Sequence, residues 1–183
     1  MDKKLLLLTL ICFYIQTSVF GQNITFQAKA GHQQYIFLNS VYKNSHDRWR
    51  GFGTAAVIMY KEKFFLNLEY SRLKANVTDK EIFYRDNTII KTIGIGTGYQ
   101  HSFTDRFKMR PAIIIGRPKW ENVKGVNLHL DLGCQYYIFK KLNIFFDTGF
   151  KFLHFDIKAP SDIADAYRNA SVMHFQLGLS FRE

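Results

Sequence analysis

Cysteine is almost absent from this chain of 183 residues, and proline occurs only three times. Of the two cysteines, Cys12 lies in an N-terminal apolar segment that we expect to be removed, which leaves Cys134 alone. A single cysteine excludes an internal disulfide and any metal site built on cysteine pairs. The scarcity of proline, together with an aromatic content of 16%, favours a fold made of β-strands.

A long apolar run occurs only at the N-terminus. Two lysines precede an apolar stretch over residues 5–19, and small or apolar residues, Val19 and Gly21, occupy the −3 and −1 positions before Gln22. This order is typical of a secretory signal peptide over residues 1–21, cleaved after Gly21. The stretch is shorter than the ~20 residues that a spanning helix needs, and an N-terminal membrane anchor is the alternative. The remaining segment, 22–183, is predicted to form one domain, and the Gly-Gln boundary resembles that of exported proteins of the Bacteroidota.

Acidic residues are few beside basic ones, 15 against 25, and the formal net charge is +10 with neutral histidines. Such a surplus can indicate a nucleic-acid partner, contact with anionic lipid, or only a solvated basic surface. Export argues against nucleic acid, and the sequence contains no basic helix or RNA-binding aromatic motif. The anionic face of lipopolysaccharide is therefore an expected neighbour, with a merely solvated surface as the alternative.

Alternation of apolar and polar residues marks the strands. It is strict from Val126 to Tyr136 and recurs in the two segments that follow. The segment at 53–60 is apolar on both faces, so its register stays open. Gly31 and Pro111 are expected to bulge or distort their strands. The first predicted strand begins at Ile24, and the other seven cover 53–60, 64–71, 89–100, 109–116, 126–136, 142–153 and 172–181.

The connections between these strands alternate in length. Three are short and polar, near residues 61–63, 102–106 and 140–141, and four are longer, at 39–50, 75–87, 117–124 and 157–168. Tight periplasmic turns alternating with larger outer loops are typical of an up-and-down barrel. Aromatic residues flank all three short turns, which favours an interfacial girdle over ordinary cross-strand pairing. The sequence therefore predicts an all-β protein, an eight-stranded antiparallel up-and-down transmembrane β-barrel.

The polar faces of the strands are expected to line the lumen. They are rich in Gly, Asn, Gln, Thr and His, and their charges are of both signs, which a narrow interior must pair. Lys29 and His129 are possible further partners for the carboxylates. The alternate glycines at 94–98 are interpreted as room for close packing rather than as a phosphate loop. The expected network, a plug of ion pairs rather than an open pore, comprises Glu69, Arg110, Asp131, Asp147 and Lys151.

The last strand ends in the segment 175–181, Phe-Gln-Leu-Gly-Leu-Ser-Phe. With this segment, the topology and the alternation, the chain resembles the small eight-stranded outer-membrane barrels typified by the OmpA transmembrane domain and OmpX. The resemblance covers the whole of 22–181 and implies residence in the outer membrane of a Gram-negative cell. It also implies that the barrel-assembly machinery reads the closing segment, although Arg182 and Glu183 follow the aromatic residue, which departs from the usual pattern.

Some barrels of this kind modify lipid A, and a deacylase needs a serine and a histidine two residues apart, near a carboxylate. His101 and Ser102 are adjacent, so they point to opposite faces of a strand. His154 and Asp156 share a face, but no serine is close in sequence, and His174 faces the lumen. We therefore expect no enzymatic activity, no metal site and no cofactor.

Two tryptophans are expected in long loops beside cations, in the set Arg48, Trp49, Arg50, Arg117, Lys119 and Trp120. This set is a candidate for contact with sugar, lipopolysaccharide or a partner, and the alternative is an outer-rim anchor in the aromatic girdle. We expect a monomer with a structural or surface-interaction role. The alternatives are a lipid A-modifying enzyme, a component of a secretion apparatus, and a soluble periplasmic lipocalin-like binder.

Overall fold

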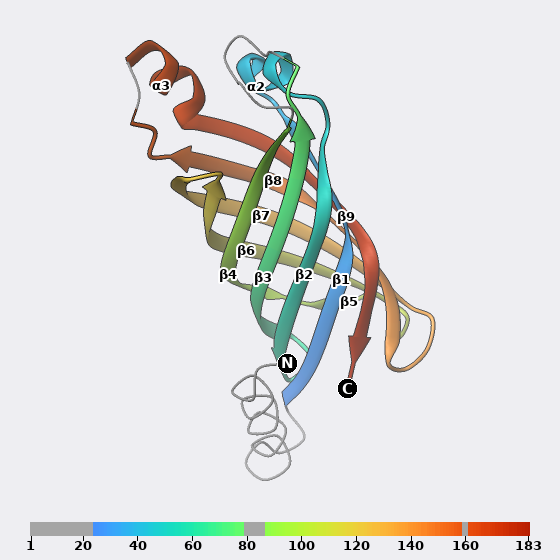
Figure 1. The fold of residues 1–183 in the computed structure, drawn as a ribbon. Coiled ribbons are helices and arrows are strands. Elements are labelled where there is room, and N and C mark those ends of the chain that lie inside the picture. The colour runs from blue at the N-terminus through green and yellow to red at the C-terminus, as the bar shows by residue number, and fades with distance from the viewer. Residues whose placement is uncertain (1–23, 79–86, 159–160) are drawn as a thin grey trace, which may run out of the picture.

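The computed structural model describes residues 24–78, 87–158 and 161–183 and shows a closed antiparallel β-barrel with two short helices (Figure 1). The expected signal peptide lies outside the described residues. The strands are β1 (Ile24–Phe37), β2 (Trp49–Tyr60), β3 (Phe64–Asn76), β4 (Asn87–Tyr99), β5 (His101–Ser102), β6 (Phe107–Trp120), β7 (Val123–Tyr137), β8 (Leu142–Phe155) and β9 (Asn169–Arg182). The helices are α2 (Ser40–Ser45) and α3 (Ser161–Arg168). None of the described helices is long and apolar enough to cross a membrane.

Eight strands close the barrel, as the sequence predicts. Sequential strands pair antiparallel, β1 pairs with β9, and β4 pairs with β6. The two-residue β5 is not a ninth strand, because it continues β4 beyond Gln100 and also pairs with β6. At this break the Gln100 amide donates to the Lys63 carbonyl at 2.5 Å, and Gln100 Nε2 donates to the Glu62 carbonyl at 2.9 Å. The neighbouring turn thus supplies the hydrogen bonds that the interruption removes.

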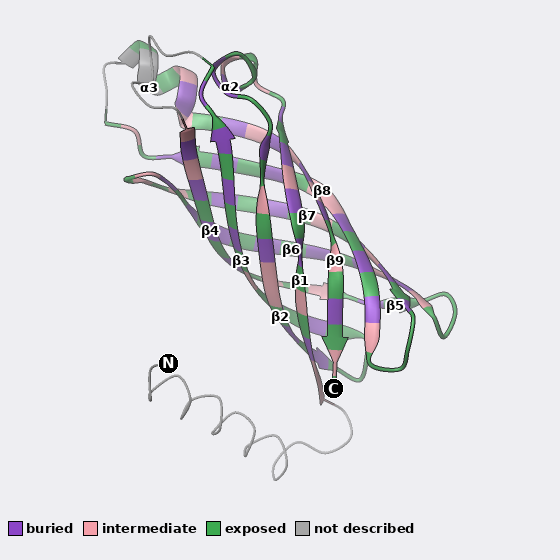
Figure 2. Ribbon diagram, turned by 45° about the vertical axis from the view of Figure 1, so that its right-hand side comes forward, coloured by how far each residue is buried: buried purple, intermediate pink, exposed green. Residues whose placement is uncertain are grey.

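Buried residues alternate with more exposed ones along most of each strand (Figure 2). In β7, Leu128 and Leu130 are 41% and 42% exposed, whereas His129 between them is 0% exposed. β2, whose register the sequence left open, turns Val57 inward and Ile58 outward. Exposed apolar side chains form a belt around the barrel. In β7 the belt spans about ten residue steps, roughly 24 Å of height at a ~45° tilt, close to the ~25 Å band of outer-membrane barrels.

The expected bulges at Gly31 and Pro111 are absent. Residues pair one to one with both neighbouring strands through Gly31, and with β7 through Pro111. A Cβ atom at position 31 would lie 2.4 Å from the Leu177 carbonyl oxygen, so glycine serves the close approach of β9 rather than a bulge. Proline removes one donor, but its fixed φ is compatible with an extended strand.

The prediction of a long loop at 117–124 is also wrong. β6 and β7 continue through this region and meet in a two-residue turn, Glu121-Asn122, in which Glu121 has a φ of 52°. Positive φ is what tight hairpin turns require. Arg117 and Lys119 suggested a loop because they are charged, yet both point outward from a regular strand while Trp120 points inward.

The two ends of the barrel differ. Both ends of the barrel's chain and the turns at 61–63, 103–106 and 138–141 lie at one end, the turn end; both helices and the tight β6–β7 turn lie at the other, the loop end (Figure 1). Aromatic residues are exposed near the short turns, for example Phe64 and Phe139, but Tyr137 faces inward and is buried. At the turn end Arg182 forms an ion pair with Glu62, and this hydrogen bond holds the pKa of Glu62 below its usual range. The residue after the closing aromatic thus ties β9 to the β2–β3 turn.

Candidate functional site

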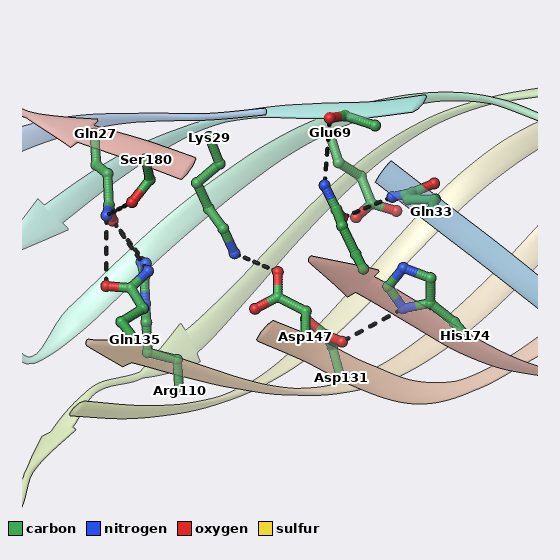
Figure 3. Close-up of polar contacts among 12 residues, drawn as sticks. Gln27, Lys29, Gln33, Glu69, Arg110, Asp131, Gln135, Asp147, His174 and Ser180 are labelled. Atoms are coloured by element: carbon green, nitrogen blue, oxygen red, sulfur yellow. Dashed lines mark hydrogen bonds and ion pairs between the residues drawn. The ribbon is translucent and has the colours of Figure 1, made fainter. Parts of the chain in front are cut away.

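Polar side chains from most of the strands meet in the middle of the lumen (Figure 3). Period-two alternation places them there, because every second residue of a barrel strand points inward. The five residues that the sequence assigned to this network all point into the barrel, with side chains that are buried or nearly so: Glu69, Arg110, Asp131, Asp147 and Lys151.

Two lysines approach two carboxylates at this level. Lys151 Nζ lies 3.4 Å from Glu69 Oε1, and Lys29 Nζ forms an ion pair with Asp147. Lys151 is 0% exposed. Burying an ion without a partner is strongly unfavourable, so each lysine offsets the cost of its carboxylate.

Two histidines flank the third carboxylate. Asp131 Oδ1 lies 3.4 Å from His129 Nε2 and 3.7 Å from His174 Nδ1. The two imidazole rings stand edge to face with their centroids 4.9 Å apart. The sequence indicated that both rings face inward, but it did not predict that two strands, β7 and β9, would bring them to one aspartate.

Arg110 was expected to pair with a carboxylate. Its observed hydrogen-bond partner is an amide instead, because Arg110 Nη1 donates to Gln27 Oε1 at 2.7 Å. Gln27 Nε2 in turn donates to Ser180 Oγ at 2.7 Å. Gln33 Nε2 donates to Gln176 Oε1 at 2.7 Å nearer the loop end. Sequence reasoning missed these amides, although their period-two positions in β1 and β9 already turn them inward.

A cavity of about 10 Å³, room for about one water, lies in this part of the lumen and is lined in part by Lys29, Asp131 and Asp147. In the wall nearby, the Arg110 guanidinium lies 4.2 Å from the centroid of the Phe65 ring in a cation–π contact. The glycines at 94–98 also allow close packing, since a Cβ at Gly96 would lie 2.4 Å from the Ile113 carbonyl oxygen.

The loop end of the lumen has a different filling, a cluster of aromatic and aliphatic side chains. The two tryptophans expected in loops belong to it: Trp49 is 2% exposed and Trp120 is 6% exposed, so neither is a loop contact or an outer-rim anchor. Both occupy inward positions of strands that extend beyond the apolar belt. This loop-end cluster comprises Tyr35, Phe37, Tyr42, Trp49, Leu73, Ala75, Ile90, Trp120, Leu153, Phe155, Tyr167, Ala170 and Val172.

Helix α2 closes over the loop-end cluster. Tyr42 stacks on Phe37 with ring centroids 4.5 Å apart, and its hydroxyl donates to the Tyr167 carbonyl at 2.5 Å. Burial, together with the charge of Tyr167, raises the pKa of Tyr42 well above its usual range. The ring centroids of His46 and Trp49 lie 5.0 Å apart. Burial lowers the pKa of His46 to about 4. The end of the lumen is therefore covered by a well-packed apolar lid.

Outside the barrel, cations gather on the same level as this cluster. Arg50 pairs with Lys74 across β2 and β3, and Lys91 pairs with Lys119 across β4 and β6. Like charges that face each other across strands are unfavourable unless an anion lies between them. No acidic residue lies on the outward face of these strands in the described part of the chain. The basic belt comprises Arg50, Arg72, Lys74, Lys91, Arg117, Lys119 and Lys124.

The basic belt lies directly beyond the apolar belt and on one side only. Arg72 follows the outward Tyr70 in β3, and Arg117 follows the outward Ile115 in β6. At the corresponding level, β8 and β9 carry His154 and Asn169, and the acidic Asp156 follows β8 beside Lys124. Arg48, the remaining cation of the predicted contact set, is exposed beside the belt, between α2 and β2.

The residues considered for catalysis do not come together. His101 and Ser102 form the exposed β5 at the turn end. His154 Nδ1 lies 2.8 Å from Asn169 Oδ1, an amide rather than a serine or a carboxylate. Asp156 is exposed, and His174 lies inside the lumen.

Comparison with known proteins identifies the architecture. No family model matches the sequence, and no curated protein matches it. Among solved structures, Ail, the attachment invasion locus protein of Yersinia pestis, is similar with a TM-score of 0.57 and 13% identity, over 88% of this chain and 99% of that one. The fold is that of the small outer-membrane barrels. The outer membrane protein AlkL, solved in lipid bilayers, gives a TM-score of 0.59 at 9% identity over 91% and 93% of the two chains. Neisserial surface protein A gives 0.52 at 14% identity over 87% and 95%.

Proposed function

We propose that this protein is an outer-membrane barrel with a closed lumen, whose loop end contacts anionic lipid and other surface partners. The carrying observation is the belt of exposed Leu, Ile and Phe around a polar interior. A water-soluble barrel would bury that belt, and a ligand-binding barrel would need a pocket of ~300–1,000 Å³. The cavity of about 10 Å³ at mid-lumen argues against the soluble binder.

The chain would reach this location by the general route for such barrels. The signal peptide predicted over residues 1–21 would direct export. Its Gly-Gln boundary resembles that of exported proteins of the Bacteroidota. The segment 175–181 forms the closing strand β9, where the barrel-assembly machinery would read it. The short turns would then face the periplasm and the helices α2 and α3 the exterior, as in other up-and-down barrels. We propose a monomer with no catalytic role.

The basic belt supports lipopolysaccharide as the lipid partner. Its cations begin where the apolar belt ends, at the level where the phosphates of lipid A would lie. Arginine and lysine bind phosphate with charge-assisted hydrogen bonds, and an anion between them would relieve their mutual repulsion. Ail has been solved in complex with the heparin analogue sucrose octasulfate, with a TM-score of 0.60 and 12% identity over 88% of this chain and 100% of that one. Because this chain carries the basic belt, we propose that it also binds a polyanion there.

Membrane fractionation tests the location. The protein should sediment with outer membranes, and its gel mobility should change on boiling, because folded barrels migrate differently from unfolded chains. Reconstituted in planar bilayers, it should add no steady conductance. Recovery in the soluble periplasm without a mobility shift would refute the proposal, and stable single-channel steps would refute the closed lumen.

A charge-matched pair of variants tests the lipid partner. Replacing Arg72, Lys91, Lys119 and Lys124 by Gln should weaken binding of lipopolysaccharide to the detergent-solubilised barrel by at least tenfold and reduce its salt dependence. The control replaces four exposed cations at the turn end, Lys61, Lys63, Lys140 and Lys141, by Gln. Equal losses in both variants would mean that only net charge matters, and the belt would then have no specific role.

A further inference from the structure

We propose that His129, Asp131 and His174 bind one divalent transition-metal ion at mid-lumen. One potential ligand atom from each residue lies within 4.8 Å of the others. The distances from Asp131 Oδ1 to His129 Nε2 and to His174 Nδ1 are 3.4 and 3.7 Å. Neighbouring ligands of a tetrahedral ion with bonds of 2.0–2.1 Å lie about 3.3 Å apart, so small movements suffice to seat an ion. The site lies apart from the basic belt on which the proposed lipid contact rests.

The three side chains are buried and lack other hydrogen bonds. His129 and His174 are 0% and 1% exposed. Both ring nitrogens of each histidine, and Asp131 Oδ1, have no hydrogen-bond partner among the described residues. Buried polar atoms are normally paired, and a cluster of them that converges on one point requires an explanation. A shared metal ion would satisfy one nitrogen of each imidazole and the carboxylate oxygen together.

The surroundings resemble the outer shell of a metal site. His129 Nδ1 lies 3.7 Å from Glu69 Oε1, and Lys151 Nζ lies 3.4 Å from the same oxygen. A metal-bound histidine commonly directs its second ring nitrogen to a carboxylate, which fixes the ring and its tautomer. Glu69, held by Lys151, stands where it would orient His129 with Nε2 toward the ion.

Donor chemistry selects the kind of ion. Two imidazoles and one carboxylate suit Zn²⁺, Co²⁺, Ni²⁺ or Cu²⁺, whereas Mg²⁺ and Ca²⁺ prefer oxygen ligands alone. Where the protein supplies three ligands, water is the usual fourth.

Refolding with metal tests the proposal. The full barrel is refolded with Zn²⁺ or Co²⁺, freed of unbound metal, and analysed for metal content and for the visible absorption of bound Co²⁺. We expect one ion per barrel. The variant His129→Gln with His174→Gln should retain less than a tenth of it, and Glu69→Gln should bind 10- to 100-fold more weakly. The control replaces the exposed His32, His101 and His154 by Gln and should retain the ion.

A second measurement needs no variant and covers the case in which the double variant does not fold. In the wild-type barrel, Zn²⁺ should shift the imidazole ¹⁵N resonances of His129 and His174 and leave those of His32 and His101 unchanged. Absence of bound metal in the wild type would overturn the proposal, as would loss of metal in the exposed-histidine control. Imidazole resonances that respond to pH but not to Zn²⁺ would show that protons alone balance the cluster, and would equally overturn it.

Discussion

Strand β3 has two halves of opposite chemistry. In the half of β3 nearer the turn end, Leu68 and Tyr70 point outward and Glu69 inward. In the half nearer the loop end, Lys74 points outward and Leu73 inward. The alternation of inward and outward side chains continues unbroken along the strand. The surrounding medium must therefore account for the exchange of apolar and polar residues between the two faces. Lipid selects the first arrangement and water the second, and the boundary between the halves marks the membrane surface.

The two fillings of the lumen differ in the same way. The loop-end cluster is packed like the core of a soluble protein, and the mid-lumen network consists of charges that offset one another. Both occupy the lumen, but a packed cluster tolerates substitutions that preserve volume, whereas an ion pair depends on both of its members.

The largest expected effect follows the removal of one buried charge. Lys151→Met leaves Glu69 buried without its cation and should lower the free energy of unfolding by roughly 3–5 kcal/mol. Denaturant unfolding in phospholipid vesicles measures it. The double variant with Glu69→Gln should regain most of the loss. If Lys151→Met unfolds like the wild type, the ionic description of the mid-lumen is wrong.

The apolar half should respond to volume instead. Phe155 is fully buried in the loop-end cluster, and Phe155→Ala should cost about 3–4 kcal/mol through the cavity it creates. Phe155→Leu removes fewer atoms and should cost clearly less. The same unfolding experiment applies, and equal costs for the two variants would mean that packing does not stabilise this end.

Outward positions should separate the two halves directly. Leu130→Arg introduces a charge in the middle of the apolar belt and should cost roughly 2–3 kcal/mol in a bilayer. Asn76→Arg, an outward and exposed position beyond the basic belt, should cost less than about 0.5 kcal/mol. Similar costs at both positions would remove the proposed membrane boundary.

A smaller effect concerns pH at the loop end. Burial lowers the pKa of His46 from 6.5 to about 4, so below pH 6.5 the unfolded chain takes up a proton that the folded protein does not. The contribution of His46 to stability should therefore decline as the pH falls from about 6.5 to 4. Comparing the unfolding midpoints of the wild type and His46→Gln at pH 7 and pH 5 isolates the contribution of His46. A pH response of equal size in both proteins would exclude His46 as its source.

The sequence predicted the eight strands and their inward faces because lipid imposes a strict alternation, best seen from Val126 to Tyr136. It failed beyond the boundary. Residues 117–124 were interpreted as a loop since charge replaced the apolar outward residues, although the strand continued with its pattern inverted. Trp49 and Trp120 were misplaced for the same reason, because an aromatic residue among cations suggests exposure when the strand end is not known.

The candidate site was predictable in composition but not in its pairing. Period two places each charge inside, yet which lysine meets which carboxylate depends on the relative heights of the strands. A shift of two residues keeps a side chain on its face and moves it by roughly 5 Å in height. His129 and Asp131 share a face in the sequence, but His174 lies 43 positions beyond Asp131 and reaches it across the intervening strand β8, where the barrel wall curves.

Spin labels along β7 give the most direct test of the central claim, that apolar faces meet lipid around a closed polar interior. The labels are placed at Leu128, Leu130 and Leu132 and at Lys124 in a Cys134→Ala background, in lipid bilayers. We expect the three leucine positions to collide with dissolved oxygen and to be shielded from a water-soluble nickel complex, with the opposite balance at Lys124. Nickel access at the leucines equal to that at Lys124 would contradict the inside-out arrangement.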